Sequence, residues 1–201
     1  RVAWGYSDGS YSTDYSSCVE TVYMNIFVLD YDISKNVQFY VDSHVRKMVI
    51  ETAQMIETNL WIDSIFDYSM PRKLNKKERD LLKETRLNIP NLFPYKPCHE
   101  NHPCTIWARS SYNNYKYMLE LFYVLLGEYK YRFGKENNTK RILLDDIEMF
   151  NPPRIGLTEF ALAIPDECKV GDSVDSYRNY YVREKSHLFT WTKRGKPYWV
   201  K

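Results

Sequence analysis

Glycine is scarce in this chain, and the loops by which many enzymes bind phosphate are absent from the sequence. Only 7 of the 201 residues are glycine, and neither Gly-x-Gly-x-x-Gly nor Gly-x-x-x-x-Gly-Lys occurs. Both loops need glycine because backbone N–H groups must approach the phosphate closely. The sequence therefore argues against ordinary dinucleotide-binding enzymes and phosphate-loop enzymes.

Long apolar runs and a strong net charge are also missing. No stretch approaches the roughly 18 consecutive apolar residues that indicate a membrane-spanning helix, and the first residues lack the basic and apolar regions of a signal peptide. We therefore expect no membrane partner. Because 28 Lys and Arg oppose 26 Asp and Glu, any affinity for DNA or RNA must come from a local cluster of cations.

Cysteine is too sparse for a disulfide framework, since the chain contains only Cys18, Cys98, Cys104 and Cys168. The segment 98–104 also holds His99 and His102, which places four potential metal ligands within seven residues. Zinc sites more often use two separated pairs of ligands. We therefore expect no metal and no cofactor, and we interpret both histidines as caps or braces of a loop. A metal site, or a role for one histidine in an active site, is the alternative.

Aromatic residues are abundant instead. The chain has 18 Tyr, 9 Phe and 5 Trp, so that aromatics make up 16% of it. Tyrosine combines a large apolar ring with a hydroxyl that needs a hydrogen-bond partner. Such residues suit a core with polar edges, a stacking site or a protein interface equally well.

The pattern along the chain predicts a mainly α (α+β) fold. Residues 1–23 are rich in Gly, Ser, Tyr and Asp and contain a single basic residue, which is typical of an extended arm; a cloning remnant is the alternative. Residues 24–201 are expected to form one compact helical domain with one or two small strands, the first over 25–30. We expect helices over 42–62, from Asn75 past Leu82, from about Ser110 to a C-cap at Gly134, over 140–150, and from about Asp172.

The helix over 42–62 carries the most distinctive pattern. Its apolar face is bordered by His44, Lys47 and Glu51 at spacings of three and four residues, so these side chains are neighbours. Charges on a solvated helix usually lie opposite the apolar face. This arrangement predicts a polar cleft, while the alternative is an ordinary Lys47–Glu51 pair beside a core histidine.

The C-terminal residues interleave cations with aromatic rings. Cations can neutralise phosphates and rings can stack on unpaired bases, so we predict a nucleic-acid-binding segment here. Its candidate residues are Tyr177, Arg178, Tyr180, Tyr181, Lys185 and Arg194. The alternative is a helix that packs Tyr177 and Tyr181 into the core and leaves its cations solvated.

Several blocks of sequence together carry a resemblance. They are 42–48 with Glu51 and Gln54, Asn-His-Pro-Cys-Thr-Ile-Trp-Ala-Arg over 101–109, 128–135, 161–167, 176–185, and Trp191 with Arg194 and Pro197. These blocks resemble a family of uncharacterised proteins encoded by tailed phages and large DNA viruses, over roughly 24–201. The resemblance implies a viral setting, in a host cytoplasm or a virion, and assigns no catalytic residue. Other viral proteins are then candidate partners of residues 1–23.

Combining these patterns, we predict a viral protein that acts on nucleic acid, such as an enzyme that excises or modifies DNA bases. Its catalytic candidates are His44, Lys47, Glu51, His102 and Asp166, and Arg109 joins the candidate nucleic-acid contacts. We expect at least three of His44, Glu51, His102, Arg109, Asp166 and Arg178 to border one cavity. A structural or assembly protein without activity and an enzyme acting on a small molecule are the alternatives.

Overall fold

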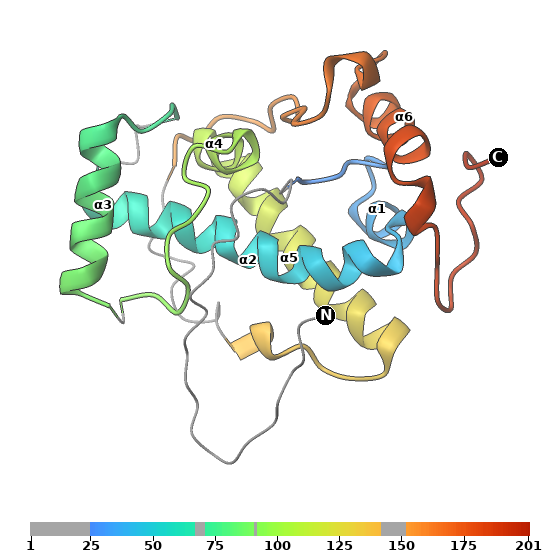
Figure 1. Cartoon of the computed structure of the whole chain (residues 1–201), viewed down its shortest axis with the longest axis horizontal. Helices are drawn as coiled ribbons and strands as arrows, with labels where there is room; N and C mark the ends of the chain where they lie inside the picture. The colour runs from blue at the N-terminus through green and yellow to red at the C-terminus, as the bar shows by residue number, and fades with distance from the viewer. Residues whose placement is uncertain (1–24, 67–70, 91, 142–151) are drawn as a thin grey trace.

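The computed structural model describes residues 25–66, 71–90, 92–141 and 152–201, and this part of the chain is mainly helical (Figure 1). Its α-helices are α1 (Ile33–Phe39), α2 (Asp42–Ile65), α3 (Lys76–Asn88), α4 (Pro103–Ser110), α5 (Tyr112–Phe133) and α6 (Ser173–Glu184). Short 3-10 helices are η1 (Asn138–Arg141), η3 (Asp166–Cys168) and η4 (Ser186–Leu188). None of the described helices is long and apolar enough to cross a membrane.

The core is built around α2 and α5. The helix α5 packs against α1, α2 and α4, as expected of a central helix, and buries Met118, Leu121, Phe122 and Leu125. However, α2 is buried along more of its length, because both of its ends are covered. Its C-terminal turns place Leu60, Trp61 and Ile62 in the same core.

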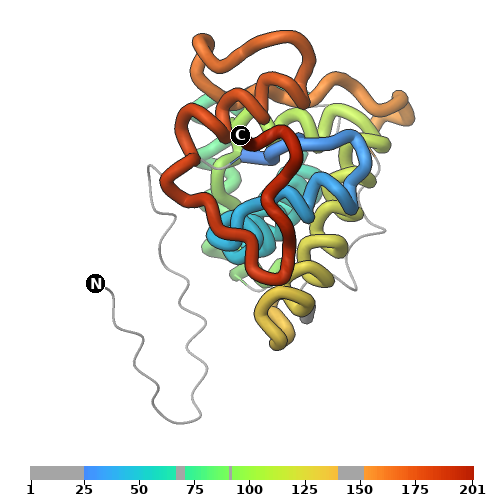
Figure 2. Tube along the Cα trace, turned by 90° about the vertical axis from the view of Figure 1, so that its right-hand side faces the viewer, coloured from blue at the N-terminus to red at the C-terminus, as the bar shows by residue number. Residues whose placement is uncertain are grey.

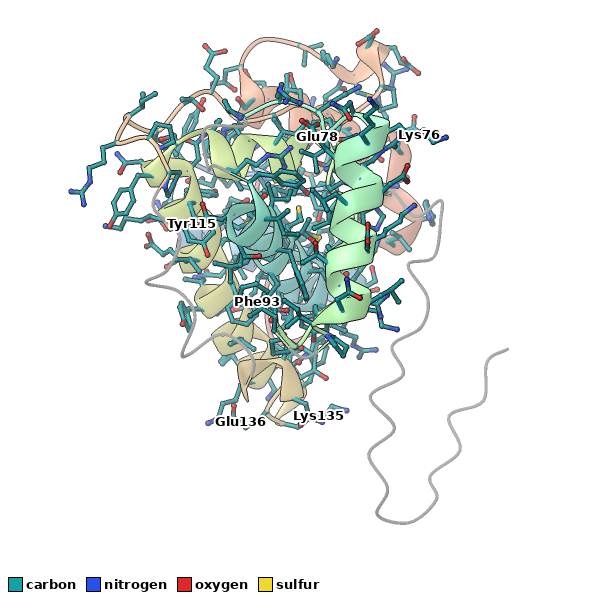
Figure 3. All side chains as sticks on the ribbon, turned by 90° about the vertical axis from the view of Figure 1, so that its left-hand side faces the viewer. Lys76, Glu78, Phe93, Tyr115, Lys135 and Glu136 are labelled. Carbon is teal, nitrogen blue, oxygen red and sulfur yellow. The ribbon has the colours of Figure 1, made fainter. Side chains whose placement is uncertain are left out.

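Local capping signals place several of these helices correctly. Asn75 and Glu78 form the expected capping box at the start of α3, which satisfies two backbone N–H groups reciprocally. Gly134 ends α5 with a φ of 69°, a left-handed conformation that glycine adopts without steric cost. Asp172 caps α6 by accepting a hydrogen bond from the Asp175 backbone. Figure 3 labels Lys76 and Glu78 at the start of α3, which faces the viewer there and lies at the left edge of the molecule in Figure 1.

The expected strand over 25–30 is wrong: this segment is buried, but no described residue forms a strand. Side chains, not a neighbouring strand, satisfy its backbone. The Leu29 N–H donates to Asn36 Oδ1 at 2.7 Å, and the Leu29 carbonyl accepts from Arg178 Nε at 2.8 Å. Tyr40 donates its hydroxyl to the Phe27 carbonyl at 2.5 Å. Backbone groups that are already hydrogen-bonded to side chains are not available to pair with a neighbouring β-strand.

Other elements were not anticipated or lie outside the described residues. The short helices α1 and α4 had no strong periodic signal, although His102 and Pro103 begin α4 with a cap and a proline in the first turn. Of the helix expected over 140–150, only the first residues are described, and they belong to η1. The arm expected over 1–23 lies outside the described residues.

The C-terminal segment crosses α1 and the start of α2, as Figure 2 shows. The Asp42 N–H donates to the Thr190 carbonyl at 2.9 Å, and Trp191 Nε1 donates to the Phe39 carbonyl at 2.9 Å. Thr192 also donates its hydroxyl to Asp42 Oδ2 at 2.6 Å. These bonds fix residues 190–192 beside the end of α1 and the first residue of α2.

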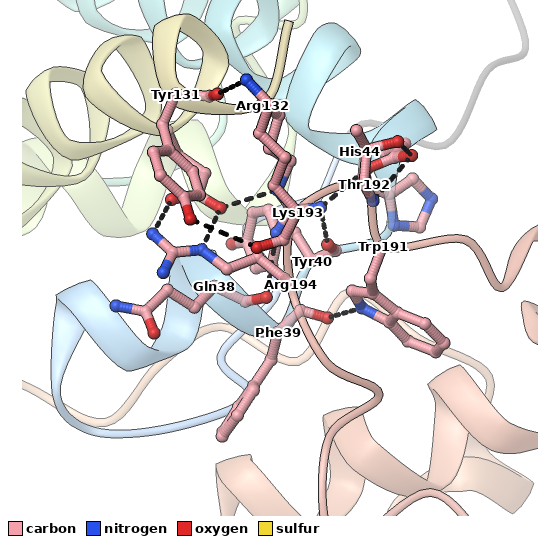
Figure 4. Close-up of polar contacts among 12 residues, drawn as sticks. Gln38, Phe39, Tyr40, His44, Tyr131, Arg132, Trp191, Thr192, Lys193 and Arg194 are labelled. Atoms are coloured by element: carbon pink, nitrogen blue, oxygen red, sulfur yellow. Dashed lines mark hydrogen bonds and ion pairs between the residues drawn. The ribbon is translucent and has the colours of Figure 1, made fainter.

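A buried ionic cluster fastens the same segment to α5 (Figure 4). Arg132 Nε donates to Glu128 Oε1 at 2.6 Å, and Arg132 Nη1 donates to Asp42 Oδ1 at 3.0 Å. Arg194 Nη2 donates to Glu128 Oε2 at 2.7 Å. Burial raises the pKa values of Asp42 and Glu128, but both are lowered overall: hydrogen bonds from Thr192 and then Arg132 lower the pKa of Asp42, and hydrogen bonds from Arg194 and Arg132 lower the pKa of Glu128. We call these four residues the ionic clasp.

Candidate active site

The polar edge of α2 contains a buried carboxyl group with an unusual environment. Lys47 Nζ lies 2.9 Å from Glu51 Oε1, and Glu51 Oε2 is buried without a hydrogen-bond partner. Burial raises the pKa of Glu51 to about 7, although the charge of Lys47 and its hydrogen bond oppose the shift. A carboxyl group with this pKa can give or accept a proton near neutral pH. Perturbed groups of this kind concentrate at functional sites.

The loop before α4 brings His99 to this edge. His99 adopts a left-handed backbone with a φ of 55°, a conformation that is uncommon for residues other than glycine. Burial lowers the pKa of His99, Glu100 opposes this shift, and the charge of Lys47 adds to it. The imidazole is therefore neutral at neutral pH and can accept a proton or a hydrogen bond.

Cys104 approaches Glu51 from the first turn of α4. Burial raises the pKa of the Cys104 thiol to about 12, and the charge of Glu51 adds to this shift. Because the thiolate is the nucleophilic form, Cys104 is not suited to nucleophilic catalysis. The thiol instead donates a hydrogen bond to Asn25 Oδ1 at 3.5 Å.

His44 has a different environment from the one expected of a proton carrier. Its Nδ1 shares a 2.5 Å hydrogen bond with the Tyr181 hydroxyl, and its ring stacks on Phe27 with 4.5 Å between centroids. Burial lowers the pKa of His44 to about 3, and the charges of Lys185, Lys47 and His187 add to this shift. A histidine that stays neutral at neutral pH serves here as a structural hydrogen-bonding group.

Three basic side chains lie near His44 in the N-terminal part of α2. Lys47 comes from α2 itself, Lys185 follows α6, and His187 lies in η4. All three lower the pKa of His44. Lys185 Nζ also lies 5.1 Å from the centre of the Tyr180 ring. This group, together with His99 and Glu51, defines the candidate active site.

The remaining catalytic candidates have structural environments. His102 caps α4 by accepting a hydrogen bond from the Cys104 N–H at 3.1 Å, as the interpretation of a capping histidine predicts. Asp166 is exposed and lies 2.6 Å from Lys169. That cation lowers the pKa of Asp166, so Asp166 is an ionised surface carboxylate.

Arg109 is also structural. Its side chain is buried and donates to the Glu100 carbonyl at 2.9 Å and to the Arg72 carbonyl at 2.6 Å. Burial lowers its pKa to about 10, so it remains protonated at neutral pH. It joins the loop before α4 to the start of α3, and this position gives it no access to a phosphate.

The tyrosines of α6 do not present free faces to bases. Tyr177, Tyr180 and Tyr181 are each at most 5% exposed, and Tyr177 donates its hydroxyl to the Ala161 carbonyl at 2.6 Å. This agrees with the alternative in which the tyrosines pack into the core. Arg194 belongs to the ionic clasp, and Arg178 binds the Leu29 carbonyl. Of the predicted nucleic-acid contacts, Lys185 therefore fits the candidate active site best.

The segment 98–104 does not assemble a metal site. Among the residues that the structure describes, no group of three or more His, Cys, Asp or Glu side chains has the spacing to hold a metal ion. Cys98 and Cys104 are both buried. The Cys98 backbone instead exchanges two hydrogen bonds with the Thr58 hydroxyl, at 2.9 and 3.0 Å.

Comparison with known proteins adds no relative. No protein-family model matches the chain, no curated protein matches it, and no solved structure matches it. The resemblance to viral proteins therefore stays a prediction, and the chemistry of the site carries the functional argument.

Proposed function

We propose that this protein is an enzyme that acts on nucleic acid, with Glu51 and Lys47 as its reacting groups. The observation that carries the proposal is the buried Glu51 carboxyl, which has a pKa of about 7 and one oxygen 2.9 Å from an amine. A carboxyl group and an amine at this distance can exchange a proton directly. Transfer from the Lys47 ammonium to the Glu51 carboxylate gives a neutral amine and a neutral acid.

These two neutral forms suit the removal of a base from a nucleotide. The Lys47 amine attacks C1′ of the sugar, a new C–N bond forms, and the bond between C1′ and the base breaks. The Glu51 acid donates its proton to the departing base, and Glu51 is then a carboxylate again. That carboxylate then accepts the proton released by the new secondary ammonium, while the neutral His99 imidazole accepts a hydrogen bond nearby.

The cations around the site support a phosphate-bearing substrate. Lys185 and His187 come from the C-terminal segment, and the ionic clasp holds this segment against α2 and α5. A lysine fixed in this way can bind a phosphate that flanks a target nucleotide, and His187 can donate a ring N–H to it. In this proposal His44 positions Tyr181 and α6, and it transfers no proton in the reaction. The viral setting belongs to the same proposal and rests on the resemblance alone.

An oligonucleotide assay tests the proposal. End-labelled single strands and duplexes, each with one damaged, modified or abasic position, would be incubated with the protein and analysed for base loss or strand cleavage. We expect Glu51→Gln and Lys47→Met to abolish product, because each removes one reacting group. Glu120→Gln and Lys35→Met change exposed residues of α5 and α1 and should retain activity. No product on any probe, or equal activity of Glu51→Gln and Glu120→Gln, would contradict the proposal.

One observation favours a second function, as a protein that docks onto an assembly. The helix α3 and the loop after it expose Leu81, Leu87 and Ile89, with 71% of Leu87 accessible. Exposed apolar groups that lie together often mark protein interfaces. If the oligonucleotide assay fails, a change in the oligomeric state of Leu87→Asp, measured by sedimentation, would support this second function.

A further inference from the structure

A pocket lies beside α6, and Glu51 is not among the residues that line it. Its volume is about 460 Å³, within the range of small-molecule sites. The residues that line it come from α6, η4 and the C-terminal residues. None of these side chains belongs to the candidate active site, so the pocket needs a separate explanation.

The lining combines apolar walls with positive charge. Val182, Phe189 and Trp199 provide apolar and aromatic surface, while the side chains of Arg178 and Lys201 are cationic and no lining side chain is acidic. Such a surface favours a ligand with a planar apolar part and an anionic part.

The position of Arg178 is fixed by its neighbours. Its Nε donates to the Leu29 carbonyl at 2.8 Å, and its Nη2 lies 3.4 Å from Asp30 Oδ2. The guanidinium also lies 5.5 Å from the ring centres of Tyr198 and Trp199. The contact with Asp30 offsets part of the charge. Within the described residues Nη1 makes no hydrogen bond, so this end of the fork remains for an anion.

Two further polar side chains line the same pocket. Asn179 donates Nδ2 to the Cys168 carbonyl at 3.1 Å, and this bond leaves the amide oxygen as an acceptor. The hydroxyl of Ser186 can both donate and accept. The Asn179 amide oxygen can therefore accept a hydrogen bond from the amino group of a base. The Ser186 hydroxyl can exchange hydrogen bonds with the hydroxyl groups of a sugar.

We infer that this pocket binds a nucleoside 5′-monophosphate. A phosphate monoester carries between one and two negative charges at neutral pH, which matches two cations better than a carboxylate does. The base fits the aromatic wall, and Arg178 with Lys201 holds the phosphate. The same chemistry occurs in a free mononucleotide and at the phosphorylated 5′ end of a strand. This inference does not depend on the proposed function, because no residue of the Glu51 site contributes to it.

Calorimetric titration of the full chain tests the inference. The probes are AMP, adenosine, and a ten-residue oligothymidylate with and without a 5′-phosphate. We expect AMP to bind and adenosine to bind at least about tenfold more weakly, since the loss of a charge-assisted contact costs about 1.4 kcal/mol or more. Stronger binding of the phosphorylated oligonucleotide than of its unphosphorylated form would identify strand ends as the source. Binding of AMP without that difference would identify free nucleotides.

Charge reversal supplies the matched variants. Lys201→Glu should weaken AMP binding at least about tenfold, whereas Lys196→Glu, which changes a lysine outside the pocket, should leave it unchanged. Ser186→Glu places a carboxylate at an exposed lining position and should weaken AMP binding without unfolding the protein. Glu51→Gln should bind AMP normally, which separates this inference from the proposed function. No AMP binding, or equal effects of Lys201→Glu and Lys196→Glu, would overturn it.

Discussion

The environment of Glu51 predicts a characteristic dependence of stability on pH. Its pKa is raised from 4.5 to about 7 in the folded protein. Between these two values the folded state holds a proton that the unfolded state has released. The stability that this proton contributes is therefore fully present below about pH 4.5 and is lost as the pH rises through about 7. The gap corresponds to about 3 kcal/mol of unfolding free energy.

Glu51→Gln isolates this contribution, because glutamine is neutral at every pH. His44 has the opposite dependence, since its folded pKa is about 3 and its ordinary value is 6.5. Its stabilising effect grows as the pH rises through this range. Because both proteins contain His44, its effect cancels in the difference between variant and wild type.

Urea unfolding at several pH values measures that difference. Relative to wild type, Glu51→Gln should gain about 3 kcal/mol of unfolding free energy between about pH 4.5 and about pH 8. The exposed control Glu120→Gln should show no such change. A Glu51→Gln difference that stays constant within about 0.5 kcal/mol over this range would refute the assigned environment of Glu51.

Four further substitutions test the surrounding structure by urea unfolding. Arg132→Met leaves the carboxylates of the ionic clasp without a buried partner and should cost about 3–5 kcal/mol. Lys130→Met removes only an exposed ion pair and should cost less than about 1 kcal/mol, so similar costs for the two would contradict the role of the clasp. His102→Ala removes the cap of α4 and should cost about 1 kcal/mol; no loss would show that the cap is dispensable. Asp166→Asn should change stability by less than about 1 kcal/mol, and a large loss would contradict its surface role.

The elements that the sequence predicted are those with strong local signals. The capping box at Asn75 and the left-handed cap at Gly134 depend on neighbouring residues alone, so they can be read directly. The edge of α2 was equally visible, because His44, Lys47 and Glu51 follow helical spacing. The spacing does not show how deeply each side chain is buried, and burial decides their roles. Burial raises the pKa of Glu51 to about 7 and lowers that of His44 to about 3.

The errors arose where tertiary contacts override local pattern. Residues 25–30 have a strand-like composition, but the side chains of Asn36, Tyr40 and Arg178 occupy their backbone groups. The tyrosines of α6 are interleaved with cations, a pattern shared by stacking surfaces and core helices. Their spacing at 177, 180 and 181 was the signal for one buried helical face.

His99 shows a different limit. It lies in a loop, so no periodicity links it to Lys47. Only its place in the Cys/His segment marked it as a candidate, beside His102. The structure gives the two histidines different roles. His102 caps the first turn of α4, whereas the charge of Lys47 lowers the pKa of His99.

Borohydride trapping tests the central claim most directly. An oligonucleotide with an abasic site offers an aldehyde at C1′, which condenses with a lysine amine to an imine and water. Borohydride reduces the imine to a stable secondary amine. We predict a covalent adduct that maps to Lys47 by peptide mass spectrometry, persists in Lys35→Met and is lost in Lys47→Met. An adduct of equal yield in Lys47→Met, or no adduct with single-stranded or duplex probes, would contradict the account.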